Sequence, residues 1–193
     1  MYVRDAKNRD EVWLLDHIEE MGLDETAFRS RDYVIAMDEQ TTERAGFGRI
    51  RIHKTDDGEI CELTSIGVLE DWRGQGVGAH VVERLVTTAR DEGFDVVYSL
   101  TGADDYLDQF GFERIEPEEL PAVLQRRLDE KRENLDADAV PLRIESDRFR
   151  MPGRLREAFK GARADDDDDE PEEGPEDFGI DPDDATYKYD TGN

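Results

Sequence analysis

The feature that most restricts the fold is a glycine-rich loop between a strand-like segment and a long amphipathic helix. Residues 61–68 have the apolar character of a strand, and residues 76–92 carry apolar side chains at helical spacing. The loop between them reads Arg73-Gly74-Gln75-Gly76-Val77-Gly78. Its glycines let the backbone approach an anion closely, and the first helical amides offer unpaired N–H groups. The loop is therefore expected to hold a phosphate, although a glycine-rich helix start also occurs for purely structural reasons.

Two other phosphate-binding loops fit the sequence less well. A nucleotide P-loop requires Gly-Lys-Ser/Thr, whereas Gly78 is followed by Ala79 and His80. Gly74, Gly76 and Ala79 satisfy the dinucleotide fingerprint, but that fingerprint follows the first strand of its fold. Here an antiparallel meander of three strand-like segments precedes the loop, so a nicotinamide-binding fold is disfavoured.

The order of segments predicts an α/β (α+β) fold. Strands are expected at 2–4, 32–37, 45–53 and 59–68, and the last three form an antiparallel meander. The apolar segment 95–100 follows the long helix, so it should pair in parallel with 59–68 through a right-handed crossover. Further short strands are expected at 112–115 and 137–146. Helices are expected at 10–21, 23–28, 76–92, 103–110, 118–134 and 152–159.

The charge distribution divides the chain into three parts. The net charge is −26, from 51 acidic and 25 basic residues, and half of it lies in residues 164–193. We expect a core at 1–116, a C-terminal extension at 117–163 and a disordered acidic tail at 164–193. Because the folded part is also acidic, the composition predicts adaptation to high salt. The same surface repels phosphate backbones, so nucleic-acid binding is disfavoured.

Several classes of protein are disfavoured by what the sequence lacks. Cys61 is the single cysteine, so an intramolecular disulfide and a cysteine-rich metal site are both excluded. The three histidines have no metal-ligand spacing, so no metal is expected. No apolar run approaches the roughly 20 residues that span a bilayer, and the N-terminus lacks a signal-like apolar region. A cytoplasmic protein without membrane contact is expected, and a homodimer is left open.

Two motifs resemble those of the GNAT (Gcn5-related) N-acetyltransferase superfamily. Residues 61–78 resemble its central motif, in which Arg73, Gly76 and Gly78 match the pattern Q/R-x-x-G-x-G/A. Residues 106–112 are similar to its second motif, a helix ending in Gly-Phe. The resemblance covers about residues 2–116, and it implies a mostly antiparallel sheet with a splayed central parallel pair and helices on both faces. Residues 99–112 and 119–121 are most similar to the N-acetylglutamate synthase branch, and the acidic composition suggests a halophilic archaeon.

The resemblance implies that acetyl-CoA is the co-substrate and that no metal takes part. In relatives, backbone amides at the position of Val68 and its neighbours bind the pantetheine arm, and amides of the loop bind the pyrophosphate. The residues expected to bind the cofactor are Ile66, Val68, Arg73, Gly74, Gln75, Gly76, Val77, Gly78 and Ala79.

The resemblance also suggests catalytic residues for direct attack of an amine on a thioester. Glu62 lies six residues before Val68, where several relatives place the base, and is expected on one strand face with Thr64, Ile66 and Val68. It could equally be a surface acid. The tyrosine that usually protonates the thiolate is replaced by Leu107. Tyr106 is adjacent but about 100° away around the helix, so packing is its favoured role and proton donation the alternative.

The function expected from these features is acetyl transfer from acetyl-CoA to a primary amine. A small molecule or an amino acid is the favoured acceptor. The alternatives are a protein lysine or N-terminal amine, or a non-catalytic module that binds acyl-CoA or a partner protein. Replacement of the tyrosine favours the non-catalytic module, whereas the intact loop favours cofactor binding.

Overall fold

The computed structural model describes residues 1–163, and the tail predicted for residues 164–193 lies outside the described residues. Its centre is a seven-stranded sheet in the order β1-β2-β3-β4-β5-β7-β6. The strands are β1 (Tyr2–Asp5), β2 (Tyr33–Met37), β3 (Arg44–Thr55), β4 (Gly58–Val68), β5 (Val96–Thr101), β6 (Glu113–Arg114) and β7 (Val140–Glu145). The helices are α1 (Glu11–Glu20), α2 (Val77–Asp91), α3 (Asp104–Asp108), α4 (Ala122–Asn134) and α5 (Gly153–Lys160).

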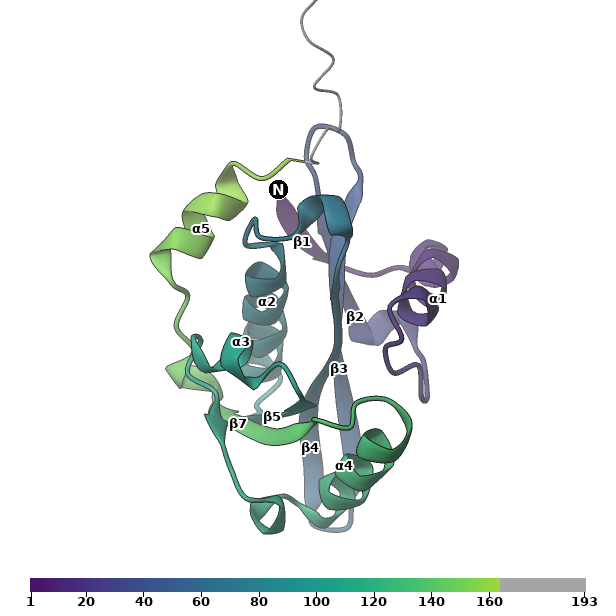
Figure 1. Cartoon of the computed structure of the whole chain (residues 1–193), viewed down its shortest axis with the longest axis vertical. Helices are drawn as coiled ribbons and strands as arrows, with labels where there is room; N and C mark the ends of the chain where they lie inside the picture. The colour runs from purple at the N-terminus through teal and green to yellow at the C-terminus, as the bar shows by residue number, and fades with distance from the viewer. Residues whose placement is uncertain (164–193) are drawn as a thin grey trace, which may run out of the picture.

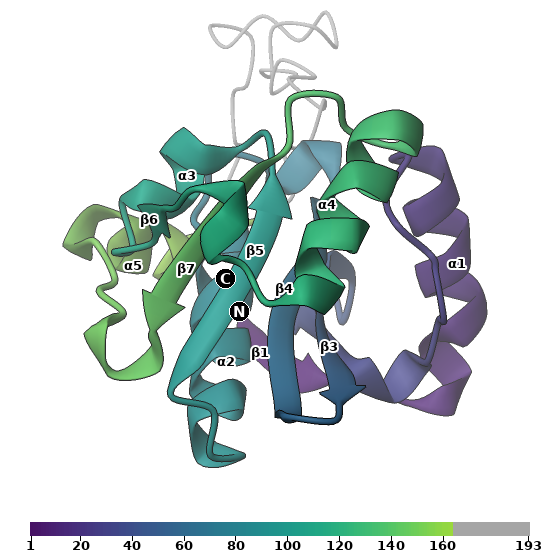
Figure 2. The ribbon, with the colours of Figure 1, turned by 90° about the horizontal axis from the view of Figure 1, so that it is seen from below.

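Helices cover both faces of the sheet. Figure 1 shows α2 and α5 on one side and α1 on the other, and Figure 2 shows α4 on the same side of the sheet as α1. The main hydrophobic core lies between the sheet and α2, whose Val81, Val82 and Leu85 are fully buried. Two smaller clusters lie under α1 and under α4. The predicted mixed α/β architecture, with helices on both faces, is therefore confirmed.

The parallel pair predicted at the centre of the sheet is β4 and β5. Every other strand pair is antiparallel. The parallel register covers only Cys61 to Leu63 of β4 and Val97 to Ser99 of β5. The Ser99 hydroxyl closes this pairing by donating to the Leu63 carbonyl at 3.0 Å. Beyond this point the two strands separate, and no other strand of residues 1–163 pairs with the side of β4 that faces β5 from Thr64 to Val68.

A β-bulge in β4 changes which side chains share a face. The β3–β4 register shifts between Phe47 and Arg49, opposite Ser65, whose φ is +50°. The bulge places Ile66 and Val68 against the core under α2, whereas Glu62 contacts α4 on the opposite face. The prediction that Glu62 shares a face with Ile66 and Val68 was wrong, because strict alternation fails at a bulge.

The helix predicted at residues 23–28 is also absent, and a buried arginine explains the difference. The Asp24 carboxylate accepts the Thr26 amide at 2.9 Å, which forms a local turn. The carbonyls of Thr26 and Ala27 accept the Arg49 guanidinium at 2.8 and 2.6 Å. Arg49 is 1% exposed, so these carbonyls satisfy a buried charge instead of continuing a helix.

The segment after residue 116 contributes directly to the sheet. Strand β7 pairs with β5 over six residues and lies between β5 and β6. Helix α4 begins at Ala122, later than predicted, because Pro117 to Glu119 form a 3-10 turn and Pro121 occupies the N-cap. The C-terminal extension therefore places β7 beside β5 and α4 under the separated strands.

Candidate functional site

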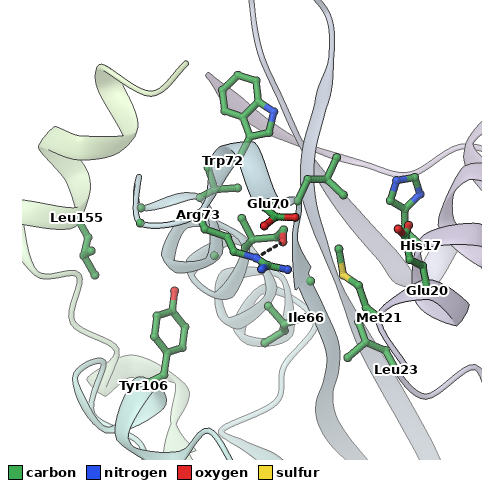
Figure 3. Close-up of a pocket in the computed structure, with 17 residues that line it drawn as sticks. His17, Glu20, Met21, Leu23, Ile66, Glu70, Trp72, Arg73, Tyr106 and Leu155 are labelled. Carbon is green, nitrogen blue, oxygen red and sulfur yellow. Dashed lines mark hydrogen bonds between the residues drawn. The ribbon is translucent and has the colours of Figure 1, made fainter. Parts of the chain in front are cut away.

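Two adjacent cavities open where β4 and β5 separate. The larger, of about 760 Å³, lies between the glycine-rich loop, α1 and α5. The smaller, of about 290 Å³, lies between the strand ends, the loop after α1 and the end of α4. Both cavities are lined by Leu23, Ile66, Val68, Gly78 and Tyr106. Figure 3 shows the larger cavity, with Met21 and Leu23 on one wall and Leu155 and Tyr106 on the other.

The glycine-rich loop presents free backbone amides to the larger cavity. Gly74 and Gly76 both have a φ of +75°, which only glycine adopts without strain. Helix α2 begins at Val77, so its first amides have no intrahelical acceptor. Within residues 1–163, no recorded backbone bond has an amide from Gly74 to Ala79 as its donor. Such a run of unpaired amides at a helix N-terminus fits a diphosphate.

The predicted cofactor residues occupy different positions around this loop. Ile66 and Val68 line both cavities, and Arg73, Gly74, Gly76, Val77 and Gly78 line the larger one. The Arg73 Nε donates to the Val68 carbonyl at 3.2 Å, across the end of β4 (Figure 3). Ala79 is fully buried, so it can contribute only its backbone. The side chain of Gln75 points instead to the C-terminus of the described chain.

Helix α5 packs directly on the loop from outside. The Gln75 side chain donates to the Arg163 carbonyl at 2.7 Å and accepts its amide at 2.9 Å. Phe159 stacks on His80 with a centroid separation of 3.8 Å. A Cβ at Gly76 would lie 2.3 Å from the Leu155 carbonyl oxygen. The loop conformation therefore depends on α5, which sequence reasoning had not connected with it.

Tyr106 lines both cavities, whereas Leu107 lines the smaller one and not the larger one. Leu107 is 2% exposed and belongs to the main core, so the position of the usual tyrosine is occupied by a packing residue. Tyr106 directs its hydroxyl toward the open space beside the loop (Figure 3). Its ring also packs edge-on against Phe110, with centroids 5.3 Å apart. Burial raises the pKa of Tyr106 to about 12, so the hydroxyl is protonated at neutral pH.

Glu62 lies beneath the smaller cavity in a buried charge network. It is fully buried, and its Oε2 accepts the Arg127 Nε at 2.6 Å and contacts His53 Nε2 at 2.7 Å. Burial opposes its ionisation, but the His53 and Arg127 bonds lower the pKa of Glu62 below its ordinary value. Its Oε1 has no hydrogen-bond partner within residues 1–163, and neither has the Thr64 hydroxyl. Two orphaned oxygens on one strand face fit a bound water between them.

Asp24 is the other carboxylate of this network. The Arg127 guanidinium donates to it through Nη2, so one arginine joins Asp24 to Glu62. Asp24 lines the smaller cavity, whereas Glu62 and Arg127 do not. Sequence reasoning missed both Asp24 and Arg127. The one available signal was the position of Arg127 on the apolar stripe of its helix, between Leu124 and Leu128.

Other candidate chemistries find no support in the described residues. Cys61 is 1% exposed, and burial raises its pKa to about 12, so it is a core residue and not a nucleophile. Trp72 is 2% exposed and packs into the core. In residues 1–163 no group of three or more histidine, cysteine and acidic side chains is placed to hold a metal ion. None of the helices described there is long and apolar enough to cross a membrane.

Comparison with known sequences identifies a matching family. The profile described as "Acetyltransferase (GNAT) family" matches residues 3–112, more than half of the chain. An uncharacterized N-acetyltransferase of Chlorobaculum tepidum is 31% identical over 68 residues, which cover 35% of this chain and 44% of that relative. The matched part is thus less than half of the relative's length.

Comparison with solved structures supports the fold. Rv2747 from Mycobacterium tuberculosis, solved with CoA, has a TM-score of 0.62 and 18% identity, covering 75% of this chain and 99% of its own. N-acetylglutamate synthase from Neisseria gonorrhoeae, complexed with coenzyme A and N-acetyl-glutamate, has a TM-score of 0.60 and 17% identity. The match covers 74% of this chain and 34% of the synthase chain. A chain of the NatC complex bound to Gag peptide and CoA has a TM-score of 0.52 and 14% identity. The match covers 75% of this chain and 97% of that chain.

Proposed function

Because the chain belongs to the acetyltransferase (GNAT) family, we propose that it transfers an acetyl group from acetyl-CoA to a primary amine. The observation that carries this proposal is the run of unpaired amides from Gly74 to Ala79 beside the unpaired edge of β4. The amides fit the diphosphate of the cofactor, and the edge fits its peptide-like pantetheine arm. The thioester then lies near Tyr106, where the two cavities meet.

The reaction proposed is direct transfer. The amine nitrogen attacks the thioester carbonyl, a C–N bond forms, the C–S bond breaks and the amine loses one proton. A water held by Glu62 Oε1 and the Thr64 hydroxyl would accept that proton, with Glu62 as the base. The protonated Tyr106 hydroxyl can donate to the departing thiolate. This proposal takes the base role predicted for Glu62 and, for Tyr106, proton donation, which was the alternative to packing.

The favoured acceptor is a small molecule or an amino acid. The end of the site reserved for it encloses about 290 Å³, close to the lower limit of roughly 300–1,000 Å³ for ligand pockets. A protein amine is the second candidate, because the NatC complex with its peptide has the same fold. A cytoplasmic location, a high-salt source, a homodimer and kinship with N-acetylglutamate synthases remain predictions within this proposal.

A matched pair of variants at Gly74 tests cofactor binding. Nothing lies within 4 Å of a Cβ at Gly74, so a side chain there meets no clash, and the backbone strain at its φ of +75° is shared by asparagine and aspartate and cancels between the two variants. Gly74→Asp places a negative charge beside the expected diphosphate, whereas Gly74→Asn has the same shape without it. Calorimetry in molar KCl should show that acetyl-CoA binds the aspartate variant at least about 10-fold more weakly than the asparagine variant. Gly76 is less suitable, because its Cβ would strike Leu155.

Thiol release in the presence of amines tests the transfer itself. If wild-type protein binds acetyl-CoA and releases CoA only when an amine is present, the proposed function is supported. If it binds acetyl-CoA but turns over none of a broad set of small amines and peptides, the non-catalytic module becomes the better account. Equal acetyl-CoA affinity in the folded Gly74→Asp and Gly74→Asn variants would place the cofactor elsewhere.

A further inference from the structure

The smaller cavity carries charged groups of both signs at the end away from the glycine-rich loop. Asp24 comes from the loop after α1, Lys131 from the last turn of α4, and Asp136 from the turn that follows. The rest of its lining is apolar or hydroxylic, including Leu100, Leu135 and Ser99. Charged side chains in a small, mostly apolar cavity fix the orientation and the identity of a ligand.

Asp24 presents a fixed negative charge to this cavity. It is 4% exposed, and burial alone would raise its pKa, but bonds from Thr26 and Arg127 lower it to about 2. Arg127 is shared with Glu62, and Arg51 Nη1 lies 4.0 Å from the same Asp24 oxygen, Oδ2. The other oxygen, Oδ1, accepts the Thr26 amide and has no cation recorded beside it within residues 1–163. Asp24 is therefore ionised at every physiological pH and suited to hold an ammonium group beside Thr64 and the orphaned Glu62 oxygen.

Lys131 presents donors to the same cavity. Its ammonium group donates to the Leu100 carbonyl at 2.5 Å, at the end of β5. An ammonium group has three donors, and this is the one hydrogen bond recorded for it within residues 1–163. Asp136, the acid that lines this cavity together with Lys131, already accepts the amides of Gly102 and Asp138. Two donors of Lys131 are therefore available to an anionic group of the ligand.

We propose that the acceptor is a zwitterionic amino acid, whose amine is held by Asp24 and whose carboxylate is held by Lys131. The proposal rests on the acetyl transfer proposed above. A simple alkylamine would leave the two remaining donors of Lys131 without an acceptor from the ligand, and a residue within a peptide chain has no free carboxylate beside its amine. The volume of about 290 Å³ fits one amino acid and excludes a folded protein segment. Asp24 and Lys131 would then be the residues that determine specificity.

The test compares each common L-amino acid with its α-amide, which keeps the amine and the side chain but lacks the negative charge. Turnover is followed by thiol release from acetyl-CoA in molar KCl. At least one amino acid should be acetylated with a kcat/KM about 10- to 100-fold above that of its amide, the range expected for losing a hydrogen bond between charged groups. Lys131→Met should remove most of this preference by slowing the amino acid alone.

Lys54→Met is the matched control, because Lys54 is exposed on β3 and, within residues 1–163, pairs only with Glu59. This variant should keep the preference of the wild type. If amides or alkylamines are acetylated as fast as the best amino acid, or if Lys131→Met leaves the preference intact, the zwitterionic acceptor is excluded while acetyl transfer stands. If no amine of any kind releases CoA, the proposed function itself fails, and this inference fails with it.

Discussion

The cofactor end and the acceptor end of the proposed site use different kinds of binding group. At the cofactor end, backbone amides and glycines from one continuous segment, Gly74 to Ala79, provide the binding groups. At the acceptor end, buried polar side chains converge from four separate segments: Asp24 follows α1, His53 lies on β3, Glu62 on β4 and Arg127 on α4. The comparison suggests that a side chain can be added at Gly74 without a clash, whereas the charge network couples folding to chemistry.

The largest effect is expected from removing the shared cation. Arg127→Met leaves Asp24 and Glu62 as buried carboxylates without their common partner, so the free energy of unfolding should fall by about 3–5 kcal/mol. Urea denaturation in molar KCl measures this free energy of unfolding. Arg126→Met changes the adjacent, exposed arginine of the same helix and should stay within about 0.5 kcal/mol of wild type. Equal losses in the two variants would mean that the network does not support the fold.

The second effect separates chemistry from binding. Glu62→Gln should lower kcat by about 10²-fold or more while changing the KM for acetyl-CoA little, because the loop is untouched. Activity should partly recover at higher pH, as more of the acceptor amine becomes neutral. Because the pKa of Glu62 is lowered, the carboxylate is ionised throughout this range, so the acceptor amine sets the pH dependence. Glu59→Gln is the control, because Glu59 is exposed on the same strand. If kcat had the same pH profile in both variants, Glu62 would not be the base.

The third effect concerns the pH dependence of stability. The pKa of Asp24 is lowered from 3.8 to about 2, so its ionised form stabilises the fold above pH 3.8, and this contribution is lost as the pH falls toward 2. The loss amounts to about 2 kcal/mol. Asp24→Asn should lack this part of the acid dependence, and the exposed Asp16→Asn should retain it. Identical acid unfolding of the two variants would contradict the pairing of Asp24 with Arg127.

The smallest effect is expected at Tyr106. Tyr106→Phe keeps the edge-on packing against Phe110 but removes the hydroxyl from the cavity. Because a thiolate is a good leaving group, kcat should fall by less than about 10-fold, below the range typical of an essential general acid. Tyr98→Phe on β5, outside both cavities, should leave kcat unchanged. A loss of 100-fold or more would make Tyr106 the principal proton donor.

The same contrast explains what the sequence could predict. The loop and α2 are local: glycine positions, an arginine and helical periodicity lie within one short segment, and residue spacing alone indicates their arrangement. The meander and the parallel pair followed from strand patterns and the crossover rule. These features were therefore predicted correctly from residues near one another in the chain.

The acceptor end could not be predicted in this way. Asp24 and Arg127 are 103 residues apart, and only the folded chain brings them together. The bulge at Ser65 is invisible in the apolar pattern, yet it turns Ile66 and Val68 to the face opposite Glu62. The loop at residues 23–28 depends on Arg49, more than 20 residues away. In each case a long-range buried charge or an inserted residue overrode the local pattern.

Hydrogen exchange at the backbone amides of residues 74–79 tests the central claim most directly, because the claim is that these amides bind the cofactor. Acetyl-CoA added in molar KCl should slow exchange across this loop by about 10-fold or more. It should leave unchanged the amides around Arg127, which lies outside both cavities. Saturation with acetyl-CoA that leaves the exchange of residues 74–79 unaltered, or protects another surface instead, would contradict the account.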